Sequence, residues 1–142
     1  MQATVPVANA PTHPVRSANF RHRAGLGISA LPVSFLLFDS VIKLVEIQPV
    51  LESFAQLGYP VALARAIGVL ELACLSLYLL PRTAIFGAIL LTGFLGGAIS
   101  THVRVGDPLF SHVLFPLYVG ALLWGGLYLR DARLRALLPF RN

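Results

Sequence analysis

Long apolar segments alternate with short polar turns along the chain after residue 27. Each segment is about 20 residues long, and at about 1.5 Å per residue a helix of that length spans the roughly 30 Å of hydrocarbon in a bilayer. The turns contain proline and glycine, which favour breaks between helices. The pattern therefore predicts an all-α fold, an integral membrane four-helix antiparallel bundle with spans over residues 28–47, 61–80, 84–103 and 109–129.

The first 27 residues differ from the rest of the chain. They contain several prolines and arginines but no acidic residue, which is typical of a disordered or membrane-associated tail. The apolar segment that follows lacks a small-residue cleavage site, so we expect it to be a retained span and not a signal peptide. We therefore divide the chain into a disordered basic tail, residues 1–27, and a membrane domain, residues 28–142, with a short basic C-terminal tail.

Composition also favours a membrane location. Charged residues make up 12% of the chain, against about 25% in soluble domains, and hydrophobic residues make up 56%. The formal net charge of +5 comes from arginines that cluster near the termini, without the basic stripe and interleaved aromatic residues of a nucleic-acid-binding protein. The positive-inside rule predicts that both termini lie in the cytoplasm, and the lipid bilayer is the expected partner.

Four ionisable residues lie inside the first two predicted spans. Asp39, Lys43 and Glu46 share one face of the first helix, and Glu71 is near the middle of the second. A charge at the bilayer centre costs about 2.5 to 3.5 kcal/mol, so these side chains are expected to face one another and not the lipid. Three interpretations stay open: a structural polar clasp, a pocket or proton-exchanging site, and charges that lie at the membrane surface because the predicted boundaries are wrong.

Two histidines flank the turn between the third and fourth spans. His102 and His112 lie near the same predicted outer end as Glu46. No HxxxH or HExxH spacing accompanies them, and we predict no metal site. Pro116 leaves the His112 carbonyl without its helical partner and free to turn toward a ligand. Histidines that cap helix ends are the simpler interpretation.

Small residues recur at helical spacing in the last two spans. Gly93 and Gly97 form a GxxxG motif, and Gly125 lies in the fourth span. Small residues at such intervals let helix backbones approach closely in a membrane. They predict either packing within the bundle or a face for a homo-oligomer or a partner protein.

Several motifs resemble the DoxX-like family of small bacterial four-span membrane proteins. The most specific is GGAISTHVRVGDPLFSHVLFPLYVG, residues 96–120, and the DxxxK pair at Asp39 and Lys43 also fits. With GYP, IGVLELACL, LPRTA and GGLYLRDARLRALLP, the resemblance covers about residues 28–138. It implies a four-helix membrane bundle in the bacterial inner membrane, loosely related to subunits associated with thiosulfate:quinone oxidoreduction.

The resemblance and the buried charges together suggest a function. We expect a redox-associated accessory subunit, or a protein that binds a quinone or another lipophilic molecule in a polar-lined pocket. Lys43 or His102 would donate to a carbonyl oxygen, and a carboxylate would exchange the proton. The pocket candidates are Asp39, Lys43, Glu46, Glu71, His102 and His112.

Other classes of function stay open beside this one. The only cysteine, Cys74, excludes a disulfide relay. A non-catalytic scaffold would bind a partner enzyme through the glycine faces. A small transporter-like homo-oligomer would use the same buried charges as a path. Enzymatic activity is left undecided by these patterns.

Overall fold

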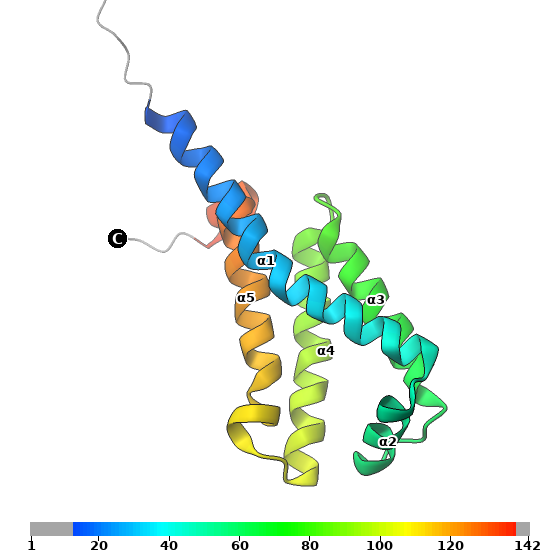
Figure 1. Ribbon diagram of the computed structural model, residues 1–142. Coiled ribbons are helices and arrows are strands. Elements are labelled where there is room, and N and C mark those ends of the chain that lie inside the picture. The colour runs from blue at the N-terminus through cyan, green and yellow to red at the C-terminus, as the bar shows by residue number, and fades with distance from the viewer. Residues whose placement is uncertain (1–12, 139–142) are drawn as a thin grey trace, which may run out of the picture.

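The computed structural model describes residues 13–138, and within that range the secondary structure is entirely helical (Figure 1), which confirms the predicted all-α class. The helices in chain order are α1 (His13–Val45), α2 (Gln48–Gln56), α3 (Leu63–Leu79), α4 (Ala84–Val105), the π-helical turn η1 (Leu109–Val113), α5 (Phe115–Arg130) and α6 (Ala132–Leu137). The long helices α1, α3, α4 and α5 alternate in direction, and α1 crosses the others obliquely.

Three segments in the described range are long and apolar enough to cross a membrane. They are Ala18–Val45, Ala84–Val105 and Leu109–Arg130. The remaining long helix, α3, has 17 residues and therefore extends about 25 Å. Its role as a fourth span stays a prediction.

The four long helices pack in a ring. α1 contacts α3 and α5, and α4 contacts the same two helices from the other side. Leucines from all four helices fill the centre and are almost completely buried: Leu36, Leu75, Leu91, Leu123 and Leu127. This ring leaves many large apolar side chains on the outside, including Leu31, Phe38, Val69, Phe86 and Leu117, each more than half exposed. An outer surface of this kind is suited to lipid and not to water.

Glycines bring α1 into close contact with two neighbours. A Cβ atom on Gly126 of α5 would lie 2.2 Å from Ser29 Oγ on α1, and one on Gly68 of α3 would lie 2.9 Å from Lys43 Cβ. Real Cβ atoms do not approach other atoms so closely, so only glycine fits at these crossings. The contact at Gly68 matters for the site because it fixes α3 beside Lys43.

Two parts of the fold correct the sequence-based description. The helix α1 begins at His13, so residues 13–27, which we assigned to a disordered tail, form its first turns; residues 1–12 lie outside the described range. The segment 48–60, which lies between the first two predicted spans and for which we predicted no helix, contains α2. Pro49 lies at the start of α2, and its apolar Val50 and Phe54 are buried against the bundle.

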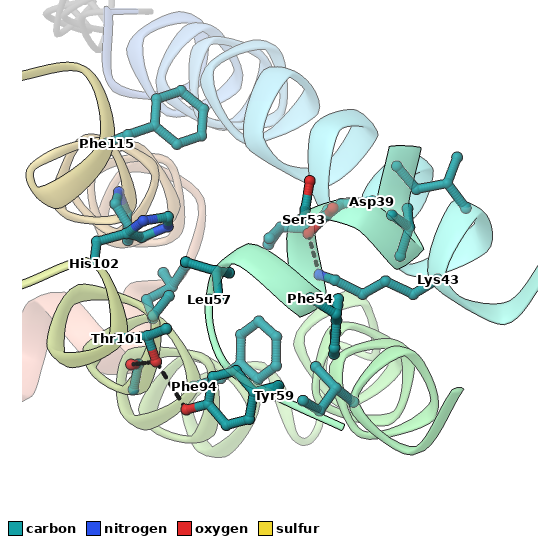
Figure 2. Close-up of a pocket in the computed structure, with 18 of the residues that line it drawn as sticks. Asp39, Lys43, Ser53, Phe54, Leu57, Tyr59, Phe94, Thr101, His102 and Phe115 are labelled. Carbon is teal, nitrogen blue, oxygen red and sulfur yellow. Dashed lines mark hydrogen bonds and ion pairs between the residues drawn. The ribbon is translucent and has the colours of Figure 1, made fainter. Parts of the chain in front are cut away.

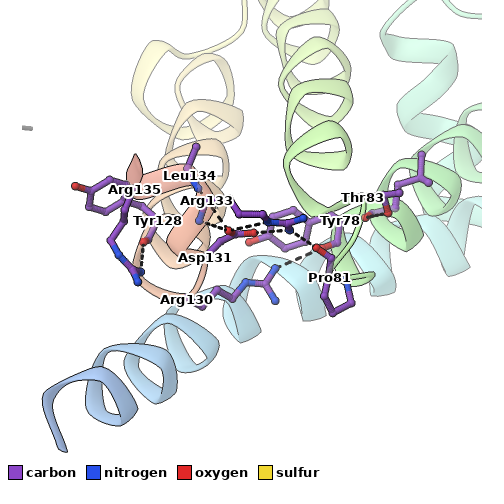
Figure 3. Close-up of polar contacts among 10 residues, drawn as sticks. Tyr78, Pro81, Thr83, Tyr128, Arg130, Asp131, Arg133, Leu134 and Arg135 are labelled. Carbon is purple, nitrogen blue, oxygen red and sulfur yellow. Dashed lines mark hydrogen bonds and ion pairs between the residues drawn. The ribbon is translucent and has the colours of Figure 1, made fainter. Parts of the chain in front are cut away.

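Arginines gather at the end of the bundle where α5 and α6 meet (Figure 3), which we call the arginine end: Arg130, Arg133 and Arg135. The Arg135 side chain donates to the carbonyl oxygens of Tyr128 and Leu129 at 3.0 and 2.7 Å, and so caps the end of α5. Arg130 lies over the ring of the buried Tyr78, 4.8 Å from its centroid. The C-terminal ends of α3 and α5 are therefore in contact here.

Asp131 begins α6 at the arginine end. Its carboxylate accepts the backbone N–H of Arg133 at 2.8 Å and contacts the Arg133 guanidinium at 2.8 Å. The side-chain hydrogen bond from Arg133 is the main reason that the pKa of Asp131 is lowered from its usual value. The same guanidinium donates to the Pro81 carbonyl, which fixes the turn between α3 and α4 against α6.

Candidate functional site

A cavity of ≈620 Å³ lies at the end of the bundle opposite the arginines (Figure 2). Its walls come from the C-terminal half of α1, from α2 and the segment after it, from α3, from α4 and from the start of α5. Aromatic side chains supply much of the apolar lining: Phe35, Phe54, Tyr59, Phe94 and Phe115. Phe35 and Phe115 pack edge to face with their ring centroids 5.0 Å apart, which joins α1 to α5 above the cavity.

One polar group in the cavity wall is the ion-paired cluster of Asp39, Lys43 and Glu71. Asp39 and Lys43 are one helical turn apart on α1, and Lys43 Nζ donates to the Asp39 carboxylate and to Glu71 Oε2, the latter at 2.8 Å. Asp39 and Lys43 line the cavity, and Glu71 reaches it only through Lys43. Three of the four ionisable side chains that we expected to face one another therefore do so, whereas the fourth, Glu46, pairs with Arg65 instead.

Glu71 is the most buried member of this cluster. Its side chain is 0% exposed, against 13% for Lys43 and 29% for Asp39. One carboxyl oxygen, Glu71 Oε1, is buried without a hydrogen-bond partner among the described residues. The Lys43 ammonium also lies 5.7 Å from the centroid of the Phe94 ring on α4. Lys43 therefore links α1, α3 and the cavity.

A second polar group lies across the cavity from Lys43, at the end of α4 (Figure 2). Tyr59, which follows α2, shares a hydrogen bond with Thr101 at 2.9 Å between the two hydroxyl oxygens. His102 lines the cavity beside them, and its Nδ1 lies 2.6 Å from Asp107 Oδ2. Because Asp107 engages Nδ1, the ring orientation is fixed and Nε2 is the nitrogen left for a ligand.

Besides Glu71, two more predicted site residues lie outside the cavity lining, Glu46 and His112. Glu46 has φ 57°, in the left-handed region, where the chain turns from α1 toward α2, and its carboxylate pairs with Arg65 at 2.8 Å. His112 lies in η1, where its Nδ1 shares a hydrogen bond with Ser111 Oγ at 2.8 Å. Its ring packs against His102 with a centroid distance of 5.8 Å, so His112 supports the wall without lining it.

The glycines of the predicted GxxxG motif do not lie at a helix crossing, unlike Gly68 and Gly126. Gly93 and Gly97 line the cavity, and a Cβ atom on either would meet no other atom within 4 Å. Gly125 is likewise open. The GxxxG motif therefore does not bring two helices together inside the described chain. On α4 it leaves the space that the cavity occupies.

Several cavity residues were absent from the sequence-based list. The helix α2 was not anticipated, so Phe54 and Tyr59 were not expected at the site. Asp107, which contacts His102 from outside the lining, was not among the candidates either. The amphipathic spacing of Val50 and Phe54 after Pro49 was the signal that could have indicated α2. Among the described residues, no group of three or more His, Cys, Asp or Glu side chains is arranged to hold a metal ion.

Comparison with known proteins gives a family and no individual relative. Neither the curated proteins nor the solved structures yielded a match. The model of the DoxX-like family matches residues 27–126, which include α2, α3, α4 and the whole cavity lining. The match covers well over half of the chain and agrees with the apolar helices long enough to cross a bilayer. The chain is therefore a membrane protein that belongs to the DoxX-like family.

Proposed function

We propose that this protein binds a lipophilic small molecule of the quinone class in the cavity, as an accessory subunit of a membrane redox system. The cavity carries the proposal. Its volume of ≈620 Å³ falls within the roughly 300–1,000 Å³ of small-molecule sites, and it combines an apolar lining with few polar side chains. That combination suits a ligand that partitions into lipid and still forms hydrogen bonds.

The placement of the polar groups favours a ring with oxygens at both ends. Lys43 lies at one side of the cavity and His102 at the other, with Phe94 between them (Figure 2). The ammonium has three N–H donors, two of which are engaged by Asp39 and Glu71, so one is left for a carbonyl oxygen. The Asp107 carboxylate accepts the Nδ1 proton of His102, so Nε2 accepts a hydrogen bond from the hydroxyl of a reduced quinone when the ring is neutral and donates to a carbonyl oxygen when the ring is protonated.

The membrane arrangement belongs to the same proposal. The protein lies in the bacterial inner membrane with four spans, and α3 is the fourth. Its support is the position of α3 between two candidate spans, α1 and α4, and its outward apolar residues Val69 and Leu70. Both termini are cytoplasmic, with the arginine end on that side and the cavity toward the opposite side, as the positive-inside rule favours.

A pair of glycine variants on α4 provides the test. Gly97 lines the cavity, so Gly97→Leu places a side chain inside it. Gly96→Leu is the control: it adds the same atoms at a neighbouring position that does not line the cavity and where a Cβ atom also meets no other atom within 4 Å. Wild-type protein and both variants are purified gently from membranes and examined by native mass spectrometry and solvent extraction. A short-tailed ubiquinone is then added to the extracted protein.

We expect one bound lipophile per chain in the wild type and in Gly96→Leu, and none in Gly97→Leu, with the same pattern for added ubiquinone. Equal amounts in the two variants, or a wild-type protein that takes up no lipophile, would contradict the proposal. A second polypeptide that co-purifies with an empty protein would instead support the scaffold function. Solute or proton flux through reconstituted wild-type protein without a bound ligand would support the transporter function.

A further inference from the structure

We propose that Glu71 is a proton-binding site inside the membrane, neutral at neutral pH, beside the ion pair of Asp39 and Lys43. This proposal goes beyond ligand binding because it concerns the protonation of Glu71 in the protein without a bound ligand. Of the residues that sequence analysis named as proton-exchange candidates, the geometry selects Glu71 as the carrier.

The charge count within the cluster is the first argument. Lys43 supplies one positive charge to two carboxyl groups, from Asp39 on the same helix and Glu71 on α3. Within residues 13–138, Lys43 is the cation that pairs with Glu71, and α2, which also packs against α3, has no basic residue. Within α4, the basic side chains lie in the last turn, at His102 and Arg104, and Lys43 meets only the Phe94 ring of that helix. If both carboxyl groups were ionised, the cluster would hold one unbalanced negative charge.

The hydrogen bonds assign the proton to one carboxyl group. An ionised carboxylate can accept about four hydrogen bonds. Glu71 accepts from Lys43 at Oε2, and its Oε1 is buried without a partner among the described residues. A neutral carboxylic acid tolerates such an environment better than a carboxylate because the charged form loses much more hydration. Asp39 is 29% exposed and faces the cavity, where water can solvate its charge.

The position of Glu71 also couples its protonation to the cavity. Glu71 does not line the cavity, but its ion-pair partner Lys43 does. A ligand that draws the Lys43 ammonium away from Glu71 removes its one hydrogen-bond donor and strengthens the hold on the proton. A ligand that displaces Lys43 from Asp39 leaves Lys43 to Glu71 and favours release of the proton. Occupancy of the cavity and protonation of Glu71 are therefore coupled through Lys43.

The test is infrared spectroscopy of the full-length protein in liposomes, stripped of lipophilic ligand so that the outcome does not depend on the proposed quinone. At neutral pH we expect a carbonyl band of a protonated carboxylic acid that is missing in Glu71→Gln. Asp39→Asn leaves Lys43 to Glu71 alone, so we expect the ratio of protonated to ionised Glu71 to fall about tenfold, the factor that corresponds to about 1.4 kcal/mol. Glu46→Gln, which changes a carboxylate already paired with Arg65, should leave the band unchanged.

Labelling with the lipid-soluble reagent dicyclohexylcarbodiimide, which attacks protonated carboxyl groups, identifies the site independently. Modification of Glu71 and not of Asp39 supports the proposal. A wild-type spectrum identical to that of Glu71→Gln overturns it, as does modification of Asp39 in place of Glu71. If the carbonyl band disappears when sodium chloride replaces potassium chloride, the cluster binds sodium ions in place of a proton. That result would also overturn the proposal.

Discussion

The crossing of α1 and α5 is a place where one added methyl group should disturb this fold measurably. Two adjacent glycines in α5 differ sharply there. A Cβ on Gly126 would lie 2.2 Å from Ser29 Oγ, 2.9 Å from the Ser29 nitrogen and 2.9 Å from the Gly25 carbonyl oxygen. A Cβ on Gly125 would meet nothing within 4 Å. The two positions therefore form a matched pair in one helix.

The expected magnitude is the difference between the unfolding free energies of the two variants. Gly125→Ala and Gly126→Ala each gain up to about 1 kcal/mol of helix propensity, which cancels in the comparison. Gly126→Ala also forces α1 and α5 apart, and overpacking of this kind costs about 1–3 kcal/mol. Rotation of a side chain relieves only the contact with Ser29 Oγ, because the other two atoms belong to the backbone. Gly126→Ala should thus be less stable than Gly125→Ala by about 1–3 kcal/mol.

The assay is reversible unfolding of the full chain in mixed micelles by added sodium dodecyl sulfate, followed by circular dichroism. Ser29→Ala combined with Gly126→Ala should recover only part of the loss, since the backbone contacts persist. Equal stability of Gly125→Ala and Gly126→Ala would refute the helix crossing and, with it, the position of α1 over the cavity.

Three further predictions concern single side chains. Tyr78→Phe removes a buried hydroxyl that donates to an α5 carbonyl at 2.8 Å, so unfolding in the same micelles should show a loss of about 1 kcal/mol. Asp107→Asn weakens the contact that orients His102, so the affinity for short-tailed ubiquinone should fall while unfolding stability changes little; unchanged affinity would argue against the His102 contact. Arg133 lowers the pKa of Asp131, so the cap of α6 stabilises the fold fully above the unfolded value of about 3.9 and less as the pH falls through the folded value. The stability advantage of wild type over Asp131→Asn should therefore shrink on acidification, and a pH-independent difference would contradict this.

The pattern of apolar segments was sufficient to predict the helical fold and its membrane location. Runs of about 20 uncharged residues leave few alternatives, because a chain in lipid must satisfy its backbone hydrogen bonds within helices. Helical periodicity also placed Asp39 and Lys43 on one face of α1, four residues apart, where they form an ion pair. These features depend on local spacing, which a sequence displays directly.

The rest of the site depended on the tertiary structure. The sequence shows that Gly93, Gly97 and Gly126 are small, but only the crossing angles of the helices decide that Gly126 packs against α1 while Gly93 and Gly97 face a cavity. The pairing of His102 with Asp107 depends on the turn that follows α4.

The division of the six predicted site residues has the same cause. Glu46 is only one turn of helix beyond Lys43, yet the chain leaves the helix there and its carboxylate meets Arg65 outside the cavity. Glu71 is 28 residues from Lys43 and still becomes its partner, because Gly68 lets α3 approach α1 closely. The sequence by itself determined which residues are too polar to face lipid. The packing of the helices decided which of them meet, since that depends on contacts between distant segments.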